Sequence, residues 1–308
     1  MPPSLIAIDW GSSSFRAYLL ARGGEAVDEI TSQHGVATVA RGAFPSTLAS
    51  LIGGWMAAHP ELPIIASGMV GSRNGWIEAP YVKCPAGATE ICANLATVEV
   101  GGRIVHIAPG LSCVDDAGLP DVMRGEEVEI LGIADRGARL VVLPGSHSKW
   151  AVTHERCVMR FKTFVTGELF STIRDHTLIG AFARAAMPRP PGSAFSLAVA
   201  RGAAAAHGGA GRPGLLGALF GARALPLMGK LAEDDAGEYL SGLIIGAEIA
   251  EARRLFPDEE PFIAGSEALV QRYLAAFAAL RAPARAAPPK AAARGLYLIA
   301  RAGGGLVE

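Results

Sequence analysis

The sequence predicts an α/β protein with two lobes of related design, and two observations lead to this prediction. Short apolar runs typical of strands alternate with helical patterns along most of the chain, as expected for an α/β fold. In addition, a unit of strand, turn and second strand occurs twice, with Gly11 and Gly145 at corresponding places 134 residues apart. This separation is about one domain length, so we interpret it as a degenerate internal duplication. A chain of 308 residues is long enough for two such lobes.

The N-terminal copy of this unit is a predicted hairpin with a turn of small residues. Residues 5–8 form an apolar run that ends at Asp9, and residues 15–20 alternate as a second strand would. The turn between the two strands, residues 10–14, contains one glycine and three serines. Such a turn leaves room for a ligand to approach the backbone closely.

Three further elements are expected in the N-terminal lobe. A helix is predicted over residues 46–58, with its first or second residue as the N-cap. A buried strand over residues 63–67 leads into residues 68–76, a loop rich in Gly and Asn. Another strand is predicted over residues 103–108 and is stopped by a Pro-Gly pair. Because loops that follow buried strands often carry binding residues, residues 68–76 are a candidate substrate loop.

Residues 111–122 are rich in turn formers, and we place the lobe boundary there, with an N-terminal lobe over 1–118 and a C-terminal lobe over 119–308. The elements expected in the C-terminal lobe are, in chain order, a helix over 125–134, a strand over 139–143, the turn 144–149, a strand over 150–153, a strand over 161–165 followed by a helix, a long helix over 238–256, a strand over 261–264 and a helix through residue 279. Residues 181–214 are rich in Ala, Pro and Gly, and we expect loops and a surface helix there. We expect the last helix of the chain to pack back on the N-terminal lobe.

Composition and charge exclude several classes of protein. Half of the residues are hydrophobic, which excludes a disordered chain. The 28 basic and 29 acidic residues give a net charge of -1, so no basic field is present to hold a nucleic acid or an anionic membrane surface. No apolar run reaches the roughly 18 to 20 residues of a membrane-spanning helix, and the N-terminus does not have the pattern of a signal peptide. We therefore expect small-molecule partners, and a homo-oligomer remains an open alternative to a monomer.

The four cysteines indicate the compartment. They contain no C-x-x-C pair and no spacing typical of a zinc site. In a chain of this size they do not suggest a disulfide framework either, so we expect reduced thiols and a cytoplasmic protein.

The residues of the first hairpin suit phosphate binding. Its small turn residues expose successive backbone N–H groups, which can form an anion-binding nest. Asp9 at the end of the first strand would lie beside the phosphates, where Mg²⁺ needs a carboxylate. Arg16 on the outgoing strand could add a guanidinium fork toward the same charge. On these residues alone, an ordinary hairpin with a solvated Asp and Arg is an equally good interpretation.

The sequence resembles the 2-dehydro-3-deoxygalactonokinase family of the actin–hexokinase–Hsp70 superfamily. The resemblance rests on blocks that recur in the same order in that family and that together span nearly the whole chain. They are residues 8–17 (IDWGSSSFRA), 67–81 (SGMVGSRNGWIEAPY), 121–132 (DVMRGEEVEILG), 143–150 (LPGSHSKW), 166–169 (TGEL), 241–249 (SGLIIGAEI) and 263–277 (IAGSEALVQRYLAAF). Any one block alone would be weak, but their number and order are specific.

The resemblance implies a two-lobed ribonuclease H-like (actin-like ATPase) fold with nucleotide between the lobes and a sugar acid deep in the interlobe cleft. It also implies a kinase that uses ATP and Mg²⁺ to phosphorylate the 6-hydroxyl of 2-dehydro-3-deoxy-D-galactonate in galactonate catabolism. The residues it implies for nucleotide binding are Gly11, Ser12, Ser13 and Arg16 in the first hairpin, Gly145, Ser146, His147 and Ser148 in the second, and Gly265 and Ser266 against the adenosine. Leu143 stands at the place in the second unit that corresponds to Asp9, so the resemblance leaves metal binding to Asp9.

The general base has two candidates. Related sugar kinases place an aspartate at the start of the helix before the second phosphate strand, and Glu126 is nearest to that position. Asp121 has the expected side chain and is the second candidate, because a primary hydroxyl needs only a carboxylate within hydrogen-bond reach. Glu126 and Asp121 could instead simply stabilise the helix dipole. For the neighbouring acid Glu127, this is the interpretation we prefer.

The candidate substrate residues are Ser67, Gly68, Ser72, Asn74, Trp76 and Arg124. Arg124 could hold the carboxylate of the sugar acid or form a surface salt bridge. Trp76, together with Tyr81, could wall the site, and core packing explains both aromatic residues at least as well.

Two other functions are compatible with the sequence. One is a kinase of the same superfamily that acts on another sugar or sugar acid. The other is a non-catalytic sugar-acid sensor, although no helix-turn-helix segment or basic patch is apparent and Asp9 is present.

Overall fold

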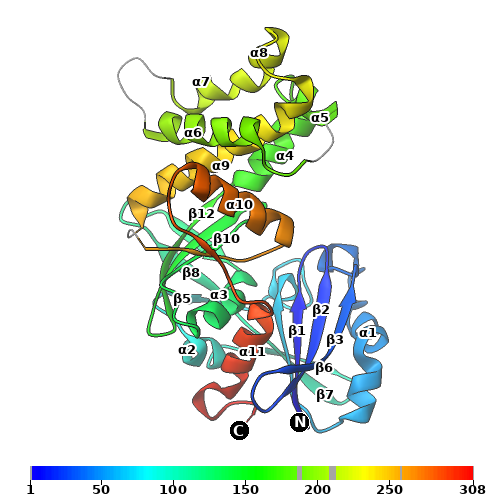
Figure 1. The fold of residues 1–308 in the computed structure, drawn as a ribbon. Helices are drawn as coiled ribbons and strands as arrows, with labels where there is room; N and C mark the ends of the chain where they lie inside the picture. Colours follow the sequence, from blue (N-terminus) through cyan, green and yellow to red (C-terminus); the bar gives the residue numbers. More distant parts are fainter. Residues whose placement is uncertain (1, 186–188, 208–212, 257–258, 308) are drawn as a thin grey trace. The chain divides into compact units, whose positions relative to one another are not determined.

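The computed structural model describes residues 2–185, 189–207, 213–256 and 259–307, which form two compact units (Figure 1). Unit 1 comprises Met1–Ala138, Ala151–Phe161 and Pro288–Glu308, and unit 2 comprises Arg139–Trp150 and Lys162–Ala287. The expected boundary between residues 118 and 119 therefore differs from the point at which the compact units divide. The reason is that the helix before residue 139 packs against the last helix of the chain, which also belongs to unit 1.

Unit 1 is built on a six-stranded sheet in the order β3-β2-β1-β4-β7-β6. Its strands are β1 (Pro3–Trp10), β2 (Phe15–Ala21), β3 (Ala26–Ser32), β4 (Ile64–Gly68), β6 (Ala96–Val100) and β7 (Arg103–Ile107). Strands β1, β4 and β7 are parallel, and β2, β3 and β6 each run antiparallel to a neighbour. The four strands predicted in this lobe are confirmed. Strands β3 and β6 were not predicted, since both are largely exposed and lack an apolar run.

A second, three-stranded sheet in unit 1 corrects one prediction. It consists of β5 (Tyr81–Lys83), β8 (Gly110–Val114) and β9 (Pro120–Met123). Residues 111–122, expected to be a turn-rich boundary, are mostly the antiparallel hairpin of β8 and β9. The turn formers are confined to its tip, where the carboxylate of Asp115 accepts hydrogen bonds from the N–H groups of Ala117 and Leu119.

The helices of unit 1 are α1 (Phe44–Ala58), α2 (Ala88–Cys92), α3 (Glu126–Ala134) and α11 (Ala291–Arg301). Helix α1 was predicted, but the expected N-cap at Ser46 or Thr47 is wrong because the helix begins earlier and no side chain caps it. Pro45 lies in its first turn, where a missing N–H costs nothing. Helix α11, at the end of the chain, packs against α3 and β1 (Figure 1).

The second large sheet has the order β12-β11-β10-β13-β14. Its strands are β10 (Leu140–Leu143), β11 (Ser148–His154), β12 (Cys157–Phe164), β13 (Phe262–Ile263) and β14 (Arg285–Ala286). The pairs β10–β13 and β13–β14 are parallel, as β1–β4 and β4–β7 are. Since β3-β2-β1-β4-β7 has the same strand order, the topology supports the internal duplication inferred from the two glycine-bearing turns.

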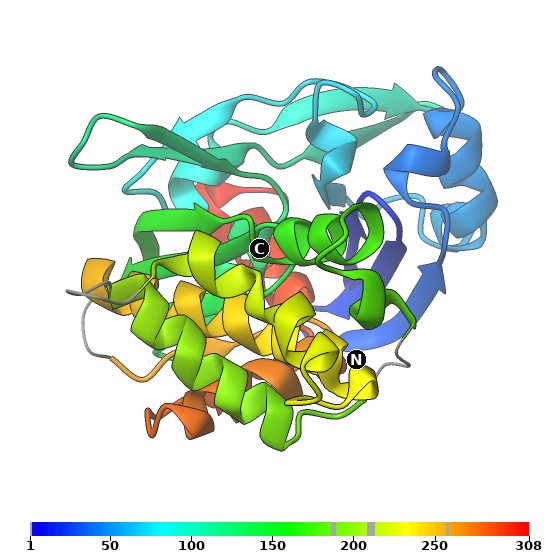
Figure 2. The same cartoon turned by 90° about the horizontal axis from the view of Figure 1, so that it is seen from above.

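Unit 2 carries most of the helices. They are α4 (Thr166–His176), α5 (Ala181–Ala185), α6 (Ser193–His207), α7 (Leu215–Leu219), α8 (Gly221–Leu227), α9 (Ala236–Leu255) and α10 (Glu267–Ala279). A surface helix was expected within residues 181–214, and α6 is such a helix, with one face exposed and the other packed along α9 (Figure 2). Glycines make this contact possible, because a Cβ at Gly202 or Gly246 would overlap the backbone of the other helix.

Two other expectations concern membranes and disulfides. Among the described residues, no helix has the length and apolar character needed to cross a membrane. All four cysteines are free thiols, as predicted.

The packing of α3 against α11 gives the first prediction. A Cβ at Gly295 of α11 would overlap the carbonyl oxygen of Val128 in α3, so Gly295→Ala should lower the free energy of unfolding by about 1–3 kcal/mol. Gly54→Ala, on an exposed part of α1 with no atom near the added methyl, should raise it by up to about 1 kcal/mol. Urea denaturation of both variants measures the difference, and equal effects of the same sign would contradict close backbone packing at Gly295.

Candidate active site

The first hairpin leaves backbone donors free at its turn. The N–H of Gly11 donates to the carbonyl of Ser14 at 2.9 Å and closes the turn. The carbonyls of Gly11 and Ser12 accept hydrogen bonds from the short helix Val36–Thr38, which holds the turn in place. Within the described part of the chain, the N–H groups of Ser12 and Ser13 make no hydrogen bond, and both residues are exposed. The turn can therefore offer these two donors to an anion.

Asp9 lies on β1 between Arg16 on β2 and Ser67 on β4, which are its partners in the sheet register. Its Oδ2 lies 3.9 Å from Nη1 of Arg16. Burial raises the pKa of Asp9, Arg16 opposes this shift, and the negative charge of Glu126 adds to it. Burial and the charge of Asp9 likewise raise the pKa of Glu129 to about 7. Negative charge thus accumulates at the end of β1 beyond what Arg16 compensates.

Two glycines bring the start of α3 close to the end of β4. Gly68 and Gly125 have φ angles of 95° and 103°, which favour glycine. A Cβ at Gly125 would lie 3.1 Å from Cα of Gly68, and a Cβ at Gly68 would lie 2.7 Å from the carbonyl oxygen of Trp10. The ends of β1 and β4 and the first turn of α3 therefore meet with backbone nearly touching backbone.

The acids at the start of α3 differ in their surroundings. Oε2 of Glu126 accepts a hydrogen bond from the N–H of Arg124 at 2.9 Å, and the side chain is half-buried. Glu127 is fully buried, and its Oε2 accepts from the N–H of Gly125 at 2.7 Å while Oε1 has no partner. Burial and the charge of Glu126 raise the pKa of Glu127 to about 8, so this carboxyl is mainly protonated at neutral pH. Asp121 is on β9 and accepts a hydrogen bond from the next backbone N–H at 2.8 Å. Of Glu126 and Asp121, Glu126 is the one that raises the pKa of Asp9.

Arg124 is enclosed by the substrate loop. Its Nη2 donates to the carbonyl of Ala79 at 2.8 Å, and its guanidinium carbon lies 4.3 Å from the centre of the Tyr81 ring. Its Nε and Nη1, like Oγ of Ser72, are buried without a hydrogen-bond partner. Ser67 is also buried, with its hydroxyl 3.5 Å from the carbonyl of Ile8. The sequence singled out these residues as substrate contacts, and the structure places their polar atoms inside the protein.

Asn74 and Trp76 lie elsewhere in the same loop. They line an open pocket of about 520 Å³ in unit 1, which also includes Arg41 and Arg73. Neither arginine was a candidate from the sequence, because Arg41 belongs to none of the recurring blocks and Arg73 carries no motif of its own.

The second hairpin is held by the start of α4. The N–H of Glu168 donates to the carbonyl of Ser146 at 3.0 Å, and a Cβ at Gly167 would overlap the carbonyl of Gly145. Nε2 of His147 lies 2.5 Å from Oε2 of Glu168, with both side chains more than half exposed. The predicted phosphate donor His147 therefore already has an acidic partner.

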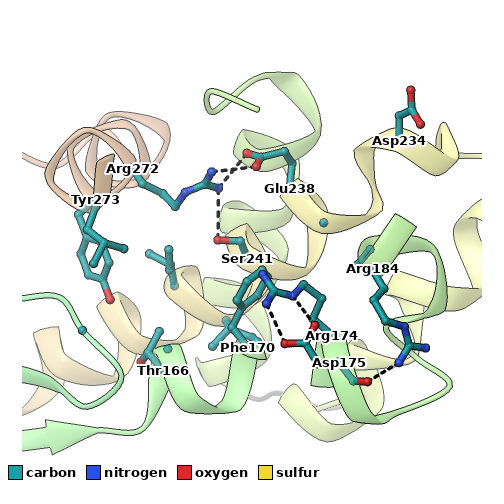
Figure 3. Close-up of a pocket in the computed structure, with 17 residues that line it drawn as sticks. Thr166, Phe170, Arg174, Asp175, Arg184, Asp234, Glu238, Ser241, Arg272 and Tyr273 are labelled. Carbon is teal, nitrogen blue, oxygen red and sulfur yellow. Dashed lines mark hydrogen bonds and ion pairs between the residues drawn. The ribbon is translucent and has the colours of Figure 1, made fainter. Parts of the chain in front are cut away.

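The second hairpin opens into a pocket of about 440 Å³ in unit 2 (Figure 3). Gly145, Thr166 and Gly167 lie on its wall, together with apolar residues such as Phe170, Ile244 and Leu269. Helix α10 contributes Leu269, Arg272 and Tyr273, whereas Gly265 and Ser266, the predicted adenosine contacts, precede this helix and are not among the lining residues. A pocket of this volume with an apolar wall is of the size that takes a nucleoside.

Two arginines of this pocket are paired with carboxylates. Arg272 holds both carboxylate oxygens of Glu238 at 2.8 Å, and Arg174 holds Asp175 at 2.7 Å (Figure 3). Arg272 also donates to Oγ of Ser241 at 3.3 Å. These pairs hold both guanidinium groups in place, whereas Arg184 on the same wall donates to main-chain carbonyls of residues 175 and 177.

A buried hydrogen-bond network joins the second hairpin to helices α9 and α10. Glu248 of α9 accepts hydrogen bonds from Nε1 of Trp150 at 2.7 Å and from the hydroxyl of Tyr273 at 2.6 Å. The Tyr273 hydroxyl is also 3.0 Å from Oγ of Ser148, the first residue of β11 after the turn. Ser148 was expected to contact phosphate, yet it is fully buried in this network. The sign of this network in the sequence is an acid, Glu248, within the apolar run of residues 240–250.

This network leads to a prediction for Tyr273→Phe. Loss of the hydroxyl removes a donor from a buried carboxyl, so the free energy of unfolding should fall by about 1–3 kcal/mol. We also expect a higher KM for ATP, because Tyr273 lines the pocket and holds the hairpin. Tyr18→Phe is the matched control for stability, since the Tyr18 ring is also buried but its hydroxyl bonds to no described residue. Denaturation and steady-state assays test this, and a Tyr273→Phe variant as stable as Tyr18→Phe would contradict it.

Comparisons with known proteins agree with this architecture. Residues 9–299 match the family model described as 2-keto-3-deoxy-galactonokinase. The 2-dehydro-3-deoxygalactonokinase of Escherichia coli (strain K12) is 35% identical over 283 residues, which are 91% of each chain. A probable 2-dehydro-3-deoxygalactonokinase of Rhizobium meliloti (strain 1021) is 40% identical over 80% of this chain and 79% of its own.

A solved structure extends the similarity to the fold. A protein from Sinorhizobium meliloti assigned as a 2-dehydro-3-deoxygalactonokinase superposes with a TM-score of 0.83 at 36% identity, covering 96% of this chain and 98% of that one. The fold is mixed α/β with two compact units, as the sequence predicted. The chain belongs to the 2-keto-3-deoxy-galactonokinase family.

Proposed function

We propose that this chain transfers the γ-phosphoryl group of ATP to the 6-hydroxyl of 2-dehydro-3-deoxy-D-galactonate, a step of galactonate catabolism. Membership of the family over residues 9–299 supports the activity. The observation that carries the assignment within the structure is the meeting of Asp9, the free N–H groups of the first turn and Glu126 at the ends of β1 and α3. Phosphoryl transfer requires these three functions: a carboxylate for the metal, donors for phosphate and an acceptor for the hydroxyl proton.

The proposed nucleotide residues belong to both hairpins. The N–H groups of Ser12 and Ser13, at the turn that begins with Gly11, would donate to phosphate oxygens, with Arg16 adding positive charge. In unit 2, the backbone of Gly145 and Ser146 would contact phosphate and the 440 Å³ pocket would hold the nucleoside. Gly265 and Ser266 remain proposed as the adenosine contact at the start of α10, with His147 as a donor that exchanges Glu168 for phosphate.

Asp9 fits a magnesium ion. Among the described residues, no three His, Cys, Asp or Glu side chains form a metal-binding group, so a dedicated protein cage is not seen. Mg²⁺ does not require one, because it is commonly held by one or two carboxylates, water and substrate phosphates. Asp9 keeps 26% of its side chain exposed, and the neighbouring acid that raises its pKa would favour a cation there. When bound, the ion would neutralise charge on the transferred phosphoryl group.

Glu126 is the proposed general base. It begins α3, and it is exposed enough for its carboxylate to accept the proton of the 6-hydroxyl. Glu127 is unsuited to this role because it is protonated at neutral pH and fully buried. Asp121 remains the second candidate. We assign Arg124 a positioning role, in which it ties residues 79–81 to the start of α3.

The activity is tested by following ADP release with ATP, Mg²⁺ and a panel of neutral hexoses, amino sugars and ketodeoxy sugar acids. We expect the highest kcat/KM with 2-dehydro-3-deoxy-D-galactonate, and a preference for a neutral hexose would reject this substrate. Asp9→Asn should lose nearly all turnover while keeping its melting temperature, because a neutral amide cannot replace the metal carboxylate. If Asp9→Asn kept most of its kcat at saturating Mg²⁺, the metal role would be wrong.

The identity of the base is tested by two isosteric variants. Glu126→Gln should lower kcat by about 10²- to 10⁴-fold with little change in KM for ATP, as expected for loss of a general base. Asp121→Asn, which changes a side chain on β9, should retain most of its kcat. Steady-state kinetics decide between them, and the reverse result would make Asp121 the base.

A further inference from the structure

We infer that the 520 Å³ pocket of unit 1 holds the carboxylate end of the sugar acid, with Arg41 and Arg73 as the residues that recognise the carboxylate. This inference rests on the proposed function and adds to it the site and the residues that select an acid over a neutral sugar. It replaces Arg124 in that role by two residues outside the sequence-based set.

The pocket lies between two segments that are far apart in the chain. Residues 39–44, just before and within the start of α1, form one side, and residues 73–78 of the substrate loop form the other. Its volume is within the range of roughly 300–1,000 Å³ typical of small-molecule sites. Within the loop, the N–H of Trp76 donates to the carbonyl of Val70 at 2.8 Å, which holds the pocket side of the loop in a defined turn.

Aromatic contacts connect the pocket to β1, the strand that carries Asp9. Trp76 stacks on Phe44 with ring centres 6.1 Å apart and an angle of 10°. Phe44 in turn contacts Trp10 edge-on at 5.5 Å, and Trp10 directly follows Asp9 on β1. This chain of aromatic rings fixes the pocket relative to the proposed metal carboxylate. It also gives the pocket a flat apolar surface for the C–H groups of a sugar chain.

The two arginines differ from the other arginines near the proposed site. Arg16 lies beside Asp9, and Arg124 donates to main-chain carbonyls. By contrast, no residue of the described chain forms an ion pair or hydrogen bond with the guanidinium of Arg41 or Arg73, and both side chains are exposed on the pocket wall. The free N–H groups of Arg124 are buried and present no surface to a ligand. Two unpaired guanidinium groups in a concave site are suited to a carboxylate, which each can bind with two parallel hydrogen bonds.

The remaining polar side chains suit the rest of the ligand. Asn74 and Glu78 also line the pocket. An amide donates to and accepts from hydroxyl groups, whereas a carboxylate accepts from them and repels another carboxylate. Glu78 therefore orients the sugar acid with its hydroxyl groups nearby and its carboxylate at the arginines. Since the reacting hydroxyl is at C6 and the carboxylate is at C1, recognition of the acid and phosphoryl transfer occur at opposite ends of the substrate.

The test compares Arg41→Met, Arg73→Met and the double variant with wild type. We expect each single change to raise KM for the sugar acid about 10- to 100-fold, as for loss of a hydrogen-bonded charge, with KM for ATP and the melting temperature unchanged. Arg136→Met is the matched control, because Arg136 is exposed in unit 1 and has no partner among described residues. Its KM should equal that of wild type.

A second measurement identifies the group that is recognised. The C1 carboxamide of the substrate should bind wild type more weakly than the acid, whereas the double variant should bind the acid and the carboxamide about equally. If wild type phosphorylates the acid and the double variant keeps the wild-type KM, the inference is wrong while the proposed function stands. The inference would also be overturned if Arg124→Met raised KM for the acid without loss of stability and the two pocket variants did not. If wild type phosphorylates no sugar acid, the proposed function itself fails.

Discussion

The candidate active site depends on the close approach of three backbone segments at the ends of β1, β4 and α3. Gly68 and Gly125 both have positive φ angles, and a methyl group on either would meet the backbone of a neighbouring segment. This contact places Glu126, the first residue of α3, within electrostatic reach of Asp9. A side chain at either glycine would separate the helix from the strand end, and the proposed base and metal carboxylate would separate with it.

The electrostatic consequence of this contact is an excess of negative charge that the protein does not balance locally. Burial and mutual repulsion raise the pKa values of Asp9, Glu127 and Glu129, and Arg16 is the cation that opposes the shift at Asp9. The protein accommodates Glu127 by keeping it protonated in the interior. Asp9 remains partly exposed, so its charge is accessible to the proposed magnesium ion. The two acids thus suit different roles because their access to solvent differs.

The sequence predicted those parts of the fold that depend on local pattern. Strands β1, β2, β4 and β10, helices α3 and α9 and the paired hairpins follow from apolar runs and turn residues that are adjacent in the chain. It did not show which small residues allow close packing. A surface helix was expected within residues 181–214, but the pattern gave no sign that Gly202 brings α6 into backbone contact with α9. The hairpin of β8 and β9 was missed because the turn formers around Asp115 dominate so short a segment.

The residues of the candidate site also differ in whether local sequence pattern could predict them. Asp9 and Glu126 could be found because each stands at the end of a recognisable element. Arg41 could not be found, because its relation to Trp76 exists only after α1 packs beside the substrate loop. With a net charge of -1, the chain has no general attraction for an anionic sugar acid or nucleotide, so unpaired donors must be placed where each anion binds. Exposed guanidinium groups without a partner lower neither stability nor solubility. Packing between segments that are distant in the chain can bring them together in a pocket, and no sequence motif then marks them.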